Sequence, residues 1–476
     1  MAGFFIDAMK LNIKPNSAEK REIVNQIRNK STDTIAALAT PKGRGAIAIV
    51  RISGENAINV AAGLVKYPKK FRSRESHRLH LVDVLQEDGH LLDRALCAIF
   101  RNPNSYTGED LVEFFLHGGI YIAAQTMERL CKSGARVAEP GEFTLRAFLN
   151  GRMDLAQAEA VADLVAAESA AAHRVAVLQR EGALSQRISK IRERLIQICS
   201  MVELEIDFSE QDLPVVDRGE LSVSLDEITS ELLSLEESFK RGRLAREGAT
   251  VVIAGAPNVG KSTLFNALLG EDRAIIDETP GTTRDAVEAL VQWGGWSIRL
   301  IDTAGQAERF TGPDEKAVAR SRRITKEADI VIWVMDLSET RPEYPPTEFG
   351  GRMITVGNKA DLIADGNAEV TNCYLKISAK HGVGVDEVRE AVLGALTPSD
   401  ETKLEEGVLT RERHLEAVRG GLKSLGNAKR ILKEGAGDEL LAIDLSEAAA
   451  HLGEIIGEIT PDDVLNRVFS DFCIGK

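Results

Sequence analysis

Short apolar runs bounded by glycine occur in the first third of the chain. Residues 46–52 form one such run, and residues 79–84 and 94–100 flank the sequence Glu87-Asp88-Gly89. Apolar runs of this length between turn residues are typical of strands, and an Asp-Gly pair between two of them indicates a hairpin. The pattern therefore predicts an α+β domain over residues 31–148.

The pattern changes near residue 149. Between Asp154 and Arg180, Ala, Leu, Glu and Arg dominate and Gly and Pro are nearly absent, which predicts long helices that continue to about residue 247. The same character returns from Leu409, and Thr460-Pro461 predicts a helix start with a hydroxyl N-cap and Pro at the first helical position. We expect a discontinuous helical domain, residues 149–247 and 402–476, interrupted by an α/β domain over residues 248–401.

Composition narrows the class of protein. The chain has 476 residues, too many for one core, and its net charge of -14 argues against coating nucleic acid, so an RNA contact requires a local basic face. The five cysteines lack zinc or disulfide spacing, and no apolar run approaches the roughly 18 residues of a membrane span. We expect a cytoplasmic protein without a membrane partner. Residues 1–30 resemble no targeting signal, and we interpret them as a disordered extension.

A strand, a glycine-rich loop and a helical pattern follow one another at the start of the inserted domain. Val251 to Ala254 is an apolar run, residues 255–262 spell G-A-P-N-V-G-K-S, and the helical pattern begins at Thr263. This context argues against a chance glycine-rich loop. Main-chain N–H groups of such a loop bind phosphates, the lysine neutralises them, and the serine ligates Mg²⁺. The predicted nucleotide contacts here are Asn258, Val259, Gly260, Lys261, Ser262 and Thr263.

Two further loops have the spacing of nucleotide-dependent switches. An apolar run leads into Asp302-Thr303-Ala304-Gly305, where the carboxylate holds the Mg²⁺ shell and Gly305 senses the γ-phosphate. Thr283, in the preceding loop, is placed to ligate Mg²⁺ only while the γ-phosphate is present. The predicted GTP contacts in these loops are Asp277, Glu278, Thr279, Pro280, Gly281, Thr282, Thr283, Asp302, Thr303, Ala304 and Gly305.

The base is selected by Asn358-Lys359-Ala360-Asp361, which follows an apolar strand. The Asp361 carboxylate accepts two hydrogen bonds from guanine N1–H and its exocyclic amine, donors that adenine does not present together. Ser378-Ala379-Lys380 fits the loop that closes over the base. Five elements in this order predict a Ras-like P-loop domain that binds and hydrolyses GTP.

Two residues compete to orient the attacking water. Gln306 directly follows Asp302-Thr303-Ala304-Gly305, the place of the water-orienting glutamine in Ras-type GTPases, whereas Glu315 lies further along the loop and would act through a second water. Position alone favours Gln306. Arg284 is a candidate arginine finger in cis, but its place beside Thr283 favours a surface charge.

Motifs spread over residues 33–476 resemble those of the tRNA-modifying GTPase family MnmE, also called TrmE. They are D-T-I-A-A-L-A-T-P-K-G-R-G-A-I-A-I-V-R-I-S-G from Asp33, N-S-Y-T-G-E-D-L-V-E from Asn104, H-G-G at His117, P-G-E-F-T-L-R-A-F-L-N-G-R from Pro140, D-L-A-Q-A-E-A from Asp154, G-T-T-R-D at Gly281 and F-C-I-G-K at Phe472. The resemblance implies a homodimer whose N-terminal domain is a dimerisation domain resembling tetrahydrofolate-binding folds.

The resemblance also implies an activity and partners. With MnmG, an FAD and NADH flavoprotein, members form a heterotetramer or larger complex. They add an aminomethyl or carboxymethylaminomethyl group to C5 of the wobble uridine (U34) of certain tRNAs. The one-carbon unit comes from 5-formyltetrahydrofolate or 5,10-methylenetetrahydrofolate. The folate contacts match Arg51, Glu113, Arg152 and Lys476 here; Arg152 is a departure, because familiar members can carry lysine there.

In the family, K⁺ occupies the place of an arginine finger and supports dimerisation of two GTPase domains. Its side-chain ligand matches Asn258, and its backbone ligands match Asp277, Thr279 and Thr282. The sequence Asp277-Glu278-Thr279-Pro280 is unusual for this loop in the family. Familiar members have a hydrophobic residue in place of Gln306, and Glu315 matches their catalytic glutamate once one inserted residue is allowed. The resemblance therefore ranks Glu315 ahead of Gln306.

Cys473 has three interpretations. The ending C-I-G-K is a poor prenylation signal, because glycine stands at an expected aliphatic position and lysine is last. A buried structural cysteine is the common role. The resemblance favours a functional cysteine near the folate pocket.

Other candidates have less specific interpretations. We expect His117 to be a hydrogen-bonded residue at a strand end rather than a metal ligand. Arg241, Arg243 and Arg246 are candidate tRNA contacts, although a solvated charged face is the favoured interpretation. The alternative function is a GTP-gated assembly factor for ribosomes or RNA. Such a factor usually carries a basic RNA-binding module, and none follows the GTPase domain.

Overall fold

A computed structural model describes residues 33–207, 217–270, 287–302, 323–339, 352–363, 375–397, 407–435, 437–458, 462–470 and 472–476. The chain divides into two compact units. The first contains the N-terminal residues to Ala158 and the C-terminal segment, and the second runs from Glu159 to Ile459. The predicted extension over residues 1–30 and the predicted helix start at Thr460-Pro461 lie outside the described residues.

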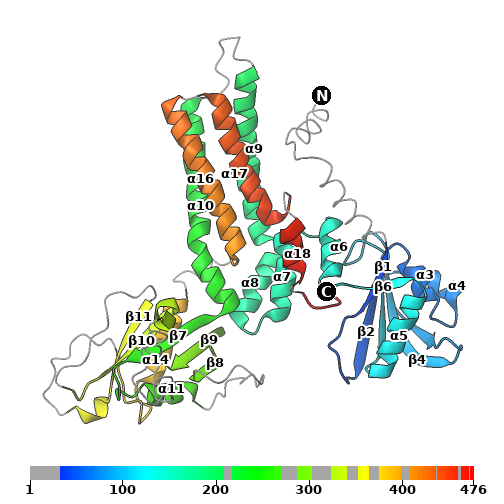
Figure 1. The fold of residues 1–476 in the computed structure, drawn as a ribbon, viewed down its shortest axis with the longest axis horizontal. Helices are drawn as coiled ribbons and strands as arrows, with labels where there is room; N and C mark the ends of the chain where they lie inside the picture. Colours follow the sequence, from blue (N-terminus) through cyan, green and yellow to red (C-terminus); the bar gives the residue numbers. More distant parts are fainter. Residues whose placement is uncertain are drawn as a thin grey trace. The chain divides into compact units, whose positions relative to one another are not determined.

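A six-stranded sheet forms the centre of the first unit (Figure 1). Its order is β3-β4-β5-β2-β1-β6, and every neighbouring pair is antiparallel except β1 with β6. The predicted hairpin is confirmed as β3 and β4. The strands are β1 (Thr34–Leu38), β2 (Ile47–Ser53), β3 (Leu79–Leu85), β4 (Leu91–Phe100), β5 (Leu111–His117) and β6 (Ala135–Val137).

Short helices complete this unit. A buried core that includes Val50, Phe71 and Phe114 lies between the sheet and the helices α3, α4 and α5. At the end of β5, the His117 side chain pairs with Asp93 at 2.7 Å, which confirms its expected role as a hydrogen-bonded strand end. The helices are α3 (Ala57–Ala62), α4 (Pro68–Arg72), α5 (Ile120–Lys132), α6 (Glu142–Leu149) and α18 (Asp462–Ser470).

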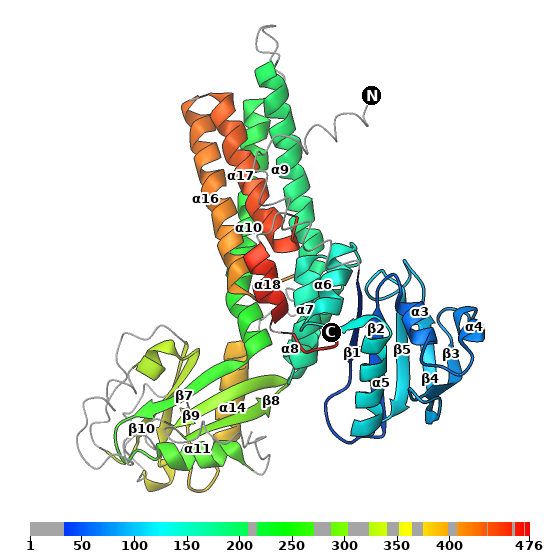
Figure 2. The same ribbon diagram turned by 45° about the vertical axis from the view of Figure 1, so that its right-hand side comes forward.

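Long helices form a bundle in the second unit (Figure 2). In α10, buried Leu221, Leu225, Ile228, Leu232 and Leu235 recur at alternating spacings of four and three residues, so they form one apolar stripe. Helices from both sides of the inserted domain pack together, as the composition predicts. They are α7 (Leu155–Ala166), α8 (Ala170–Arg180), α9 (Ala183–Asp207), α10 (Arg218–Glu247), α16 (Glu412–Glu434) and α17 (Asp438–Ile456). The division between the units falls within α7.

Buried ion pairs join α7 to α10 and α16. Glu159 is 1% exposed and accepts hydrogen bonds from Arg413 at 2.6 and 2.8 Å, while the Nε2 atom of His414 lies 2.9 Å from its Oε2. One turn further along α7, Asp163 accepts from Arg246 at 3.0 Å and from Arg411 at 2.7 Å. These pairs hold the start of α16 and the end of α10 against α7.

The predicted solvated face before the inserted domain is wrong for two of its three arginines. Arg246 pairs with Asp163, and Arg243 donates to Asp329 at 2.5 Å, where Asp329 also accepts from the main-chain N–H of Thr250. Both arginines are partly buried because α10 runs directly into the first strand of the inserted sheet. Arg243 therefore attaches α10 to this sheet, while Arg246 attaches the end of α10 to α7.

The inserted domain is built on a second six-stranded sheet, ordered β12-β11-β10-β7-β9-β8. All pairs are parallel except the hairpin β8–β9, and β10 is buried along its whole length. The elements are β7 (Ala249–Gly255), α11 (Lys261–Leu269), β8 (Val287–Trp293), β9 (Trp296–Asp302), β10 (Ile330–Asp336), β11 (Arg352–Asn358), the 3-10 helix η2 (Ala360–Leu362), β12 (Leu375–Lys376) and α14 (Val385–Leu396).

The predicted fold class, with an α+β unit, long helices and an inserted α/β sheet, is confirmed, while the domain boundaries stay a prediction. Because parallel strands end at one edge of a sheet, the carboxyl ends of β7, β9, β10 and β11 meet there and position the loops that follow them. Among the described residues, no helix is both long and apolar enough to cross a membrane.

Candidate functional site

The loop between β7 and α11 has a backbone that needs glycine. Gly255 has φ of 146° and Gly260 has φ of 95°, and Asn258 between them has φ of 65°. A Cβ atom on Gly260 would lie 2.3 Å from Nδ2 of Asn358, and one on Gly255 would lie 2.2 Å from the carbonyl oxygen of Val334. Glycine therefore permits both the dihedral angles and the close approach that a phosphate-binding loop requires.

Lys261 and Ser262 follow this loop in the first turn of α11, with the exposed Thr263 next to them. The buried Lys261 donates from Nζ to the carbonyl oxygens of Gly255 at 3.0 Å and Ala256 at 2.6 Å, so its ammonium lies within the loop. Ser262 Oγ donates to Oδ2 of Asp302, at the end of β9, over 2.6 Å. A hydroxyl and a carboxylate placed together match the oxygen ligands that Mg²⁺ prefers.

Asn358 connects the predicted base-binding residues to the phosphate loop. Its buried side chain donates from Nδ2 to the carbonyl oxygen of Val259 at 2.8 Å and accepts at Oδ1 from the main-chain N–H of Ala379 at 2.9 Å. The neighbouring Lys359 has φ of 63° and lies 2.5 Å from Asp336 at the end of β10. Burial acts to raise the pKa of Asp336, but the hydrogen bonds from Lys359 and Ser338 lower it overall.

The Asp361 side chain is a carboxylate positioned by a hydrogen bond from Ser378. Ser378 Oγ donates to its Oδ1 over 2.5 Å, and this hydrogen bond is the main cause that lowers the pKa of the Asp361 carboxyl. An ionised carboxylate is the form that accepts two hydrogen bonds from guanine. Ala360 follows Lys359 in η2, where its N–H donates to Ile377 at 2.9 Å, and Lys380 is exposed beside Ala379.

His381 belongs to this site although we did not predict it. Its Nε2 atom lies 3.6 Å from Oδ2 of Asp361. Its place one residue after the predicted Ser378-Ala379-Lys380 loop is the signal that could have identified it. The histidine therefore faces the carboxylate oxygen that Ser378 does not contact.

Several predicted residues lie outside the described residues. They include both candidates for orienting the water, Gln306 and Glu315, and the candidate finger Arg284. The remaining ones are Asp277, Glu278, Thr279, Pro280, Gly281, Thr282, Thr283, Thr303, Ala304 and Gly305. Their roles stay predictions. Of the predicted K⁺ ligands, the described one is Asn258, which is exposed.

A second candidate site lies in the first unit, where Arg51 and Glu113 face one another across β2 and β5. Arg51 Nε donates to Oε1 of Glu113 over 2.8 Å. The guanidinium carbon of Arg51 lies 5.5 Å from the ring centre of Tyr106 and 5.6 Å from that of Phe143. Aromatic faces and a carboxylate therefore fix the arginine in one orientation.

The C-terminal tail reaches the same place. Arg51 donates from Nη1 to the carbonyl oxygen of Gly475 over 3.1 Å, and a Cβ atom on Gly475 would lie 2.8 Å from the carbonyl oxygen of Leu38. Cys473 is exposed, which argues against the alternative of a buried structural cysteine, and its functional role stays a prediction. The N–H of Lys476 donates to the carbonyl oxygen of Cys473 at 3.3 Å. The structure thus brings Arg51, Glu113 and the tail together.

Arg152 is placed differently from the other three predicted folate residues. It is exposed, and its Cγ would lie 3.3 Å from a Cβ atom on Gly108. Among the described residues, no hydrogen bond or ion pair joins it to Arg51 or Glu113. A role for Arg152 in the same site stays a prediction.

Comparisons with known proteins cover both units. A family model described as "GTP-binding protein TrmE N-terminus" matches residues 34–152, and one described as "MnmE helical domain" matches residues 155–473. A protein of Christiangramia forsetii named tRNA modification GTPase MnmE is 39% identical and spans 94% of this chain and 100% of its own length. One of the same name from Cytophaga hutchinsonii is 40% identical over 94% of this chain and 98% of its own length.

One of the similar solved structures is the FeoB G-domain from Methanococcus jannaschii. It is 23% identical, with a TM-score of 0.23, and the match covers 31% of this chain and 97% of that domain.

Proposed function

Because the chain belongs to the MnmE family of tRNA modification GTPases, we propose that it uses GTP hydrolysis to modify C5 of the wobble uridine (U34) of certain tRNAs, together with the flavoprotein MnmG. The protein is a GTPase that acts in tRNA modification. The added aminomethyl or carboxymethylaminomethyl group takes its one-carbon unit from a tetrahydrofolate. The observation that carries the proposal is the joining of Arg51, Glu113 and the C-terminal tail in one place.

The chemistry of Arg51 and Glu113 fits a folate. A pterin ring presents an N–H group beside an exocyclic amine, the same pair of donors as guanine, and a carboxylate such as Glu113 accepts from both. The folate tail is anionic, and Arg51 and Lys476 supply positive charge. Tyr106 is only partly buried and offers an aromatic face for a ring, whereas the buried Phe143 helps to orient Arg51. These residues would hold 5-formyltetrahydrofolate or 5,10-methylenetetrahydrofolate, which supplies the one-carbon unit, with exposed Cys473 nearby.

Two cations are proposed for the GTPase site. Mg²⁺ would bind to Ser262 and to Thr283, with Asp302 close to Ser262, because hydroxyl and carboxylate oxygens suit this ion. K⁺ would be held by the exposed side chain of Asn258 and by the backbone of Asp277, Thr279 and Thr282. When bound, these ions would supply positive charge near the phosphates, and Lys261 within the loop would supply positive charge from the protein.

Exposed apolar residues support a homodimer through the N-terminal domain. Ile47 is 59% exposed and Ile120 is 62% exposed, and both line a cavity of 560 Å³ formed by residues 38–48 and the start of α5. The neighbouring Tyr121 is 61% exposed. Large apolar side chains grouped on one surface favour association with another protein surface. Because its proposed substrates are tRNAs, we infer that this dimer and its larger complex with MnmG act in the cytoplasm.

The experiment that tests the proposal is mass analysis of wobble nucleosides from cells that lack the gene. We expect the C5-modified uridines to disappear and to return when the wild-type gene is supplied. Glu113→Gln should fail to restore them, whereas Glu87→Gln should succeed, because Glu87 is an exposed carboxylate paired with Lys132 in the same unit. An unchanged nucleoside profile in the deletion strain would refute the proposal and favour a GTP-gated assembly factor.

A further inference from the structure

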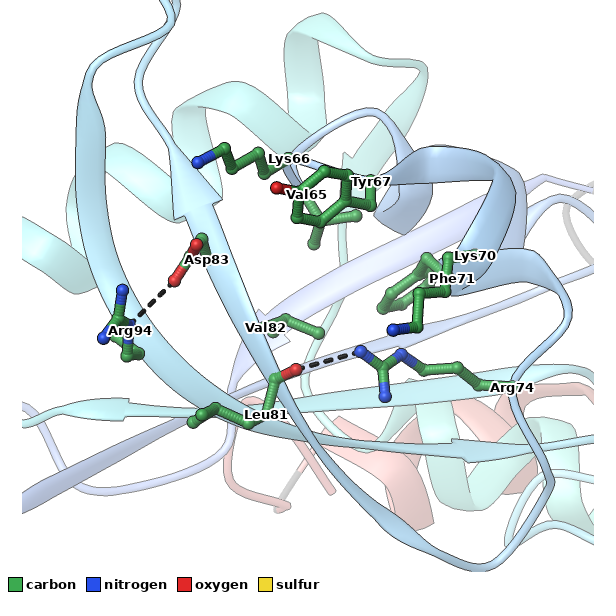
Figure 3. Close-up of a pocket in the computed structure, with 10 residues that line it drawn as sticks. All are labelled: Val65, Lys66, Tyr67, Lys70, Phe71, Arg74, Leu81, Val82, Asp83 and Arg94. Atoms are coloured by element: carbon green, nitrogen blue, oxygen red, sulfur yellow. Dashed lines mark hydrogen bonds and ion pairs between the residues drawn. The ribbon is translucent and has the colours of Figure 1, made fainter.

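A basic pocket opens at the outer edge of the first sheet, away from Arg51 and Glu113. It has a volume of 250 Å³ and lies between α4 and the hairpin β3–β4. Its lining includes four basic residues, Lys66, Lys70, Arg74 and Arg94, and one acidic residue, Asp83. Figure 3 shows the ends of Lys70 and Arg74 close to each other, with Lys66 and Arg94 on the other side of the pocket.

Backbone contacts hold this arrangement. The N–H of Lys66 donates to the carbonyl oxygen of Asp83 over 3.0 Å, which fixes the chain before α4 against β3. Arg74, after α4, donates from Nη2 to the carbonyl oxygen of Leu81 over 3.0 Å. Phe71 of α4 is 1% exposed and packs in the core below. These contacts therefore fix the two walls of the pocket, α4 and β3, relative to each other.

The positive charge of the pocket is not balanced within it. Asp83 pairs with Arg94 at 2.9 Å, so the one carboxylate is already used. Among the described residues, neither Lys66 nor Lys70 has a carboxylate partner, and the Nε atom of Arg74 is buried without a hydrogen-bond acceptor. Three cationic side chains without carboxylate partners in one concave place form a site for an anion.

The sequence around α4 extends this charge. Residues 66–78, K-Y-P-K-K-F-R-S-R-E-S-H-R, contain six Lys or Arg and a single Glu, in a chain whose net charge is -14. Tyr67 lies within this run and is 62% exposed. The Nζ atom of Lys66 lies 5.6 Å from the centre of its ring. Basic side chains interleaved with an exposed aromatic ring are the elements that bind single-stranded nucleic acid, because they supply phosphate contacts and base stacking.

We propose that this pocket binds phosphate groups of a single-stranded segment of the tRNA substrate, with one base stacked on Tyr67. The proposal rests on the proposed function for the choice of tRNA. Lys66, Lys70 and Arg74 contact the phosphates, while Arg94 is positioned by Asp83. The negative charge of the whole chain makes such a local site necessary, because the chain as a whole repels RNA.

The test is fluorescence anisotropy with a labelled, unmodified tRNA transcript and the full-length protein at several salt concentrations. The variant Lys66→Gln, Lys70→Gln leaves the contacts of Arg74 and Arg94 intact. We expect it to weaken binding at least about fivefold at low salt, and to reduce the slope of log Kd against log salt by about 1.4, the value for two lost contacts to a single strand. Tyr67→Ala should weaken binding, and Tyr67→Phe should restore it.

The matched control is Arg419→Gln, Lys429→Gln, which removes the same charge from α16, where each residue pairs with a carboxylate. Its affinity and salt slope should equal those of the wild type. If the wild type binds tRNA and the pocket variant binds equally well, the inference is wrong and the proposed function stands. If the wild type binds no tRNA at any salt concentration, the proposed function fails as well. Binding to anionic lipid vesicles, lost in the pocket variant while tRNA binding persists, would overturn the RNA assignment in favour of a membrane surface.

Discussion

The side-chain amide of Asn358 donates to the carbonyl oxygen of Val259 over 2.8 Å and so joins the end of β11 to the glycine-rich loop between β7 and α11. Its oxygen accepts from Ala379 in the third loop of the site. One buried amide thus holds together three segments that are far apart in the sequence. The arrangement explains why the space next to Asn358 has no room for a further atom.

Gly260→Ala should abolish tight nucleotide binding. The added Cβ would lie 2.3 Å from Nδ2 of Asn358, at a backbone φ of 95° that side chains rarely adopt. Titration with a fluorescent GDP analogue should show a loss of at least about tenfold in affinity, roughly 1.4 kcal/mol. The control is Gly394→Ala in α14, where no atom lies within 4 Å; it should keep affinity and raise stability by about 0.5–1 kcal/mol. Normal binding by Gly260→Ala would contradict the geometry described.

The two candidates for orienting the attacking water make opposite predictions. We expect Glu315→Ala to slow single-turnover GTP hydrolysis in the presence of K⁺ by about 100-fold or more, as for loss of a group that positions a nucleophile. Gln306→Ala should change the rate by less than about threefold. Rapid quench of a single turnover distinguishes them. A fully active Glu315→Ala variant with an inactive Gln306→Ala variant would reverse the assignment.

Arg51→Ala should remove folate binding and leave GTP hydrolysis intact. The change eliminates the ion pair with Glu113, the hydrogen bond to Gly475 and the contacts with two aromatic rings. Calorimetry with 5-formyltetrahydrofolate should detect binding to the wild type and a loss of at least about 2 kcal/mol in the variant, because Glu113 is left without its partner. Lys132→Ala, an exposed lysine of the same unit, serves as the control. Equal folate affinity in Arg51→Ala and the wild type would exclude this site.

Cys473→Ser should keep GTP turnover and lose tRNA modification. The thiol is exposed and lies three residues before Lys476 in a tail that Arg51 holds in place, so its loss leaves the GTPase site unchanged. The measurement is the amount of modified wobble uridine formed with purified MnmG, tRNA and a tetrahydrofolate. Cys131→Ser, a change on α5, is the control. Full modification by Cys473→Ser would assign the cysteine no chemical role.

The pair of Glu159 and His414 predicts lower stability at acidic pH. Burial lowers the pKa of His414 below its ordinary 6.5, so the unfolded chain binds the proton more readily than the folded chain. The stability that this residue contributes is present above pH 6.5 and is lost as the pH falls through the lowered value in the folded state. The pKa of Glu159 is also lowered, because the hydrogen bonds from His414 and Arg413 outweigh its desolvation, and this acts in the same direction at lower pH.

Urea unfolding at a series of pH values between about 7.5 and 5 measures this effect. The urea concentration at the unfolding midpoint should decrease as the pH is lowered below about 6.5. His414→Gln keeps a hydrogen-bond donor near Glu159 but takes up no proton, so the midpoint should depend less on pH. His90→Gln, which changes an exposed histidine in the β3–β4 turn, should follow the wild type. A His414→Gln curve with the wild-type slope would contradict the prediction.

The order of strand, loop and helix at the start of the inserted domain can be predicted from the sequence because the pattern is local. Gly255 to Ser262 are continuous in the sequence, and the strand before them and the helix after them each follow from a short-range pattern. The fold class followed from the same short-range patterns. The strand end at His117 was also predictable, because the residue closes an apolar run.

Contacts between distant segments were beyond this reasoning. Arg51 reaches Gly475 across 424 residues, and no local pattern encodes that meeting. Arg246 was expected in solvent, yet it lies against Asp163, because the charge pattern of one helix does not reveal which carboxylate a neighbouring helix presents. The basic pocket was missed for a different reason. The net charge of the whole chain hid the local excess in residues 66–78.

The attachment of α10 to the nucleotide-binding sheet has a mechanical consequence. At 1.5 Å per residue, the 30 residues of α10 form a helix about 45 Å long. The helix ends at Glu247, two residues before β7 begins, and near this end Arg243 pairs with Asp329. A tilt of α10 by about 5° at its C-terminal end would displace its N-terminal end by roughly 4 Å, for a helix of that length. If α10 pivoted about Gly248, a small shift in the sheet near the phosphates would thus move the far end of the helix by several times as much.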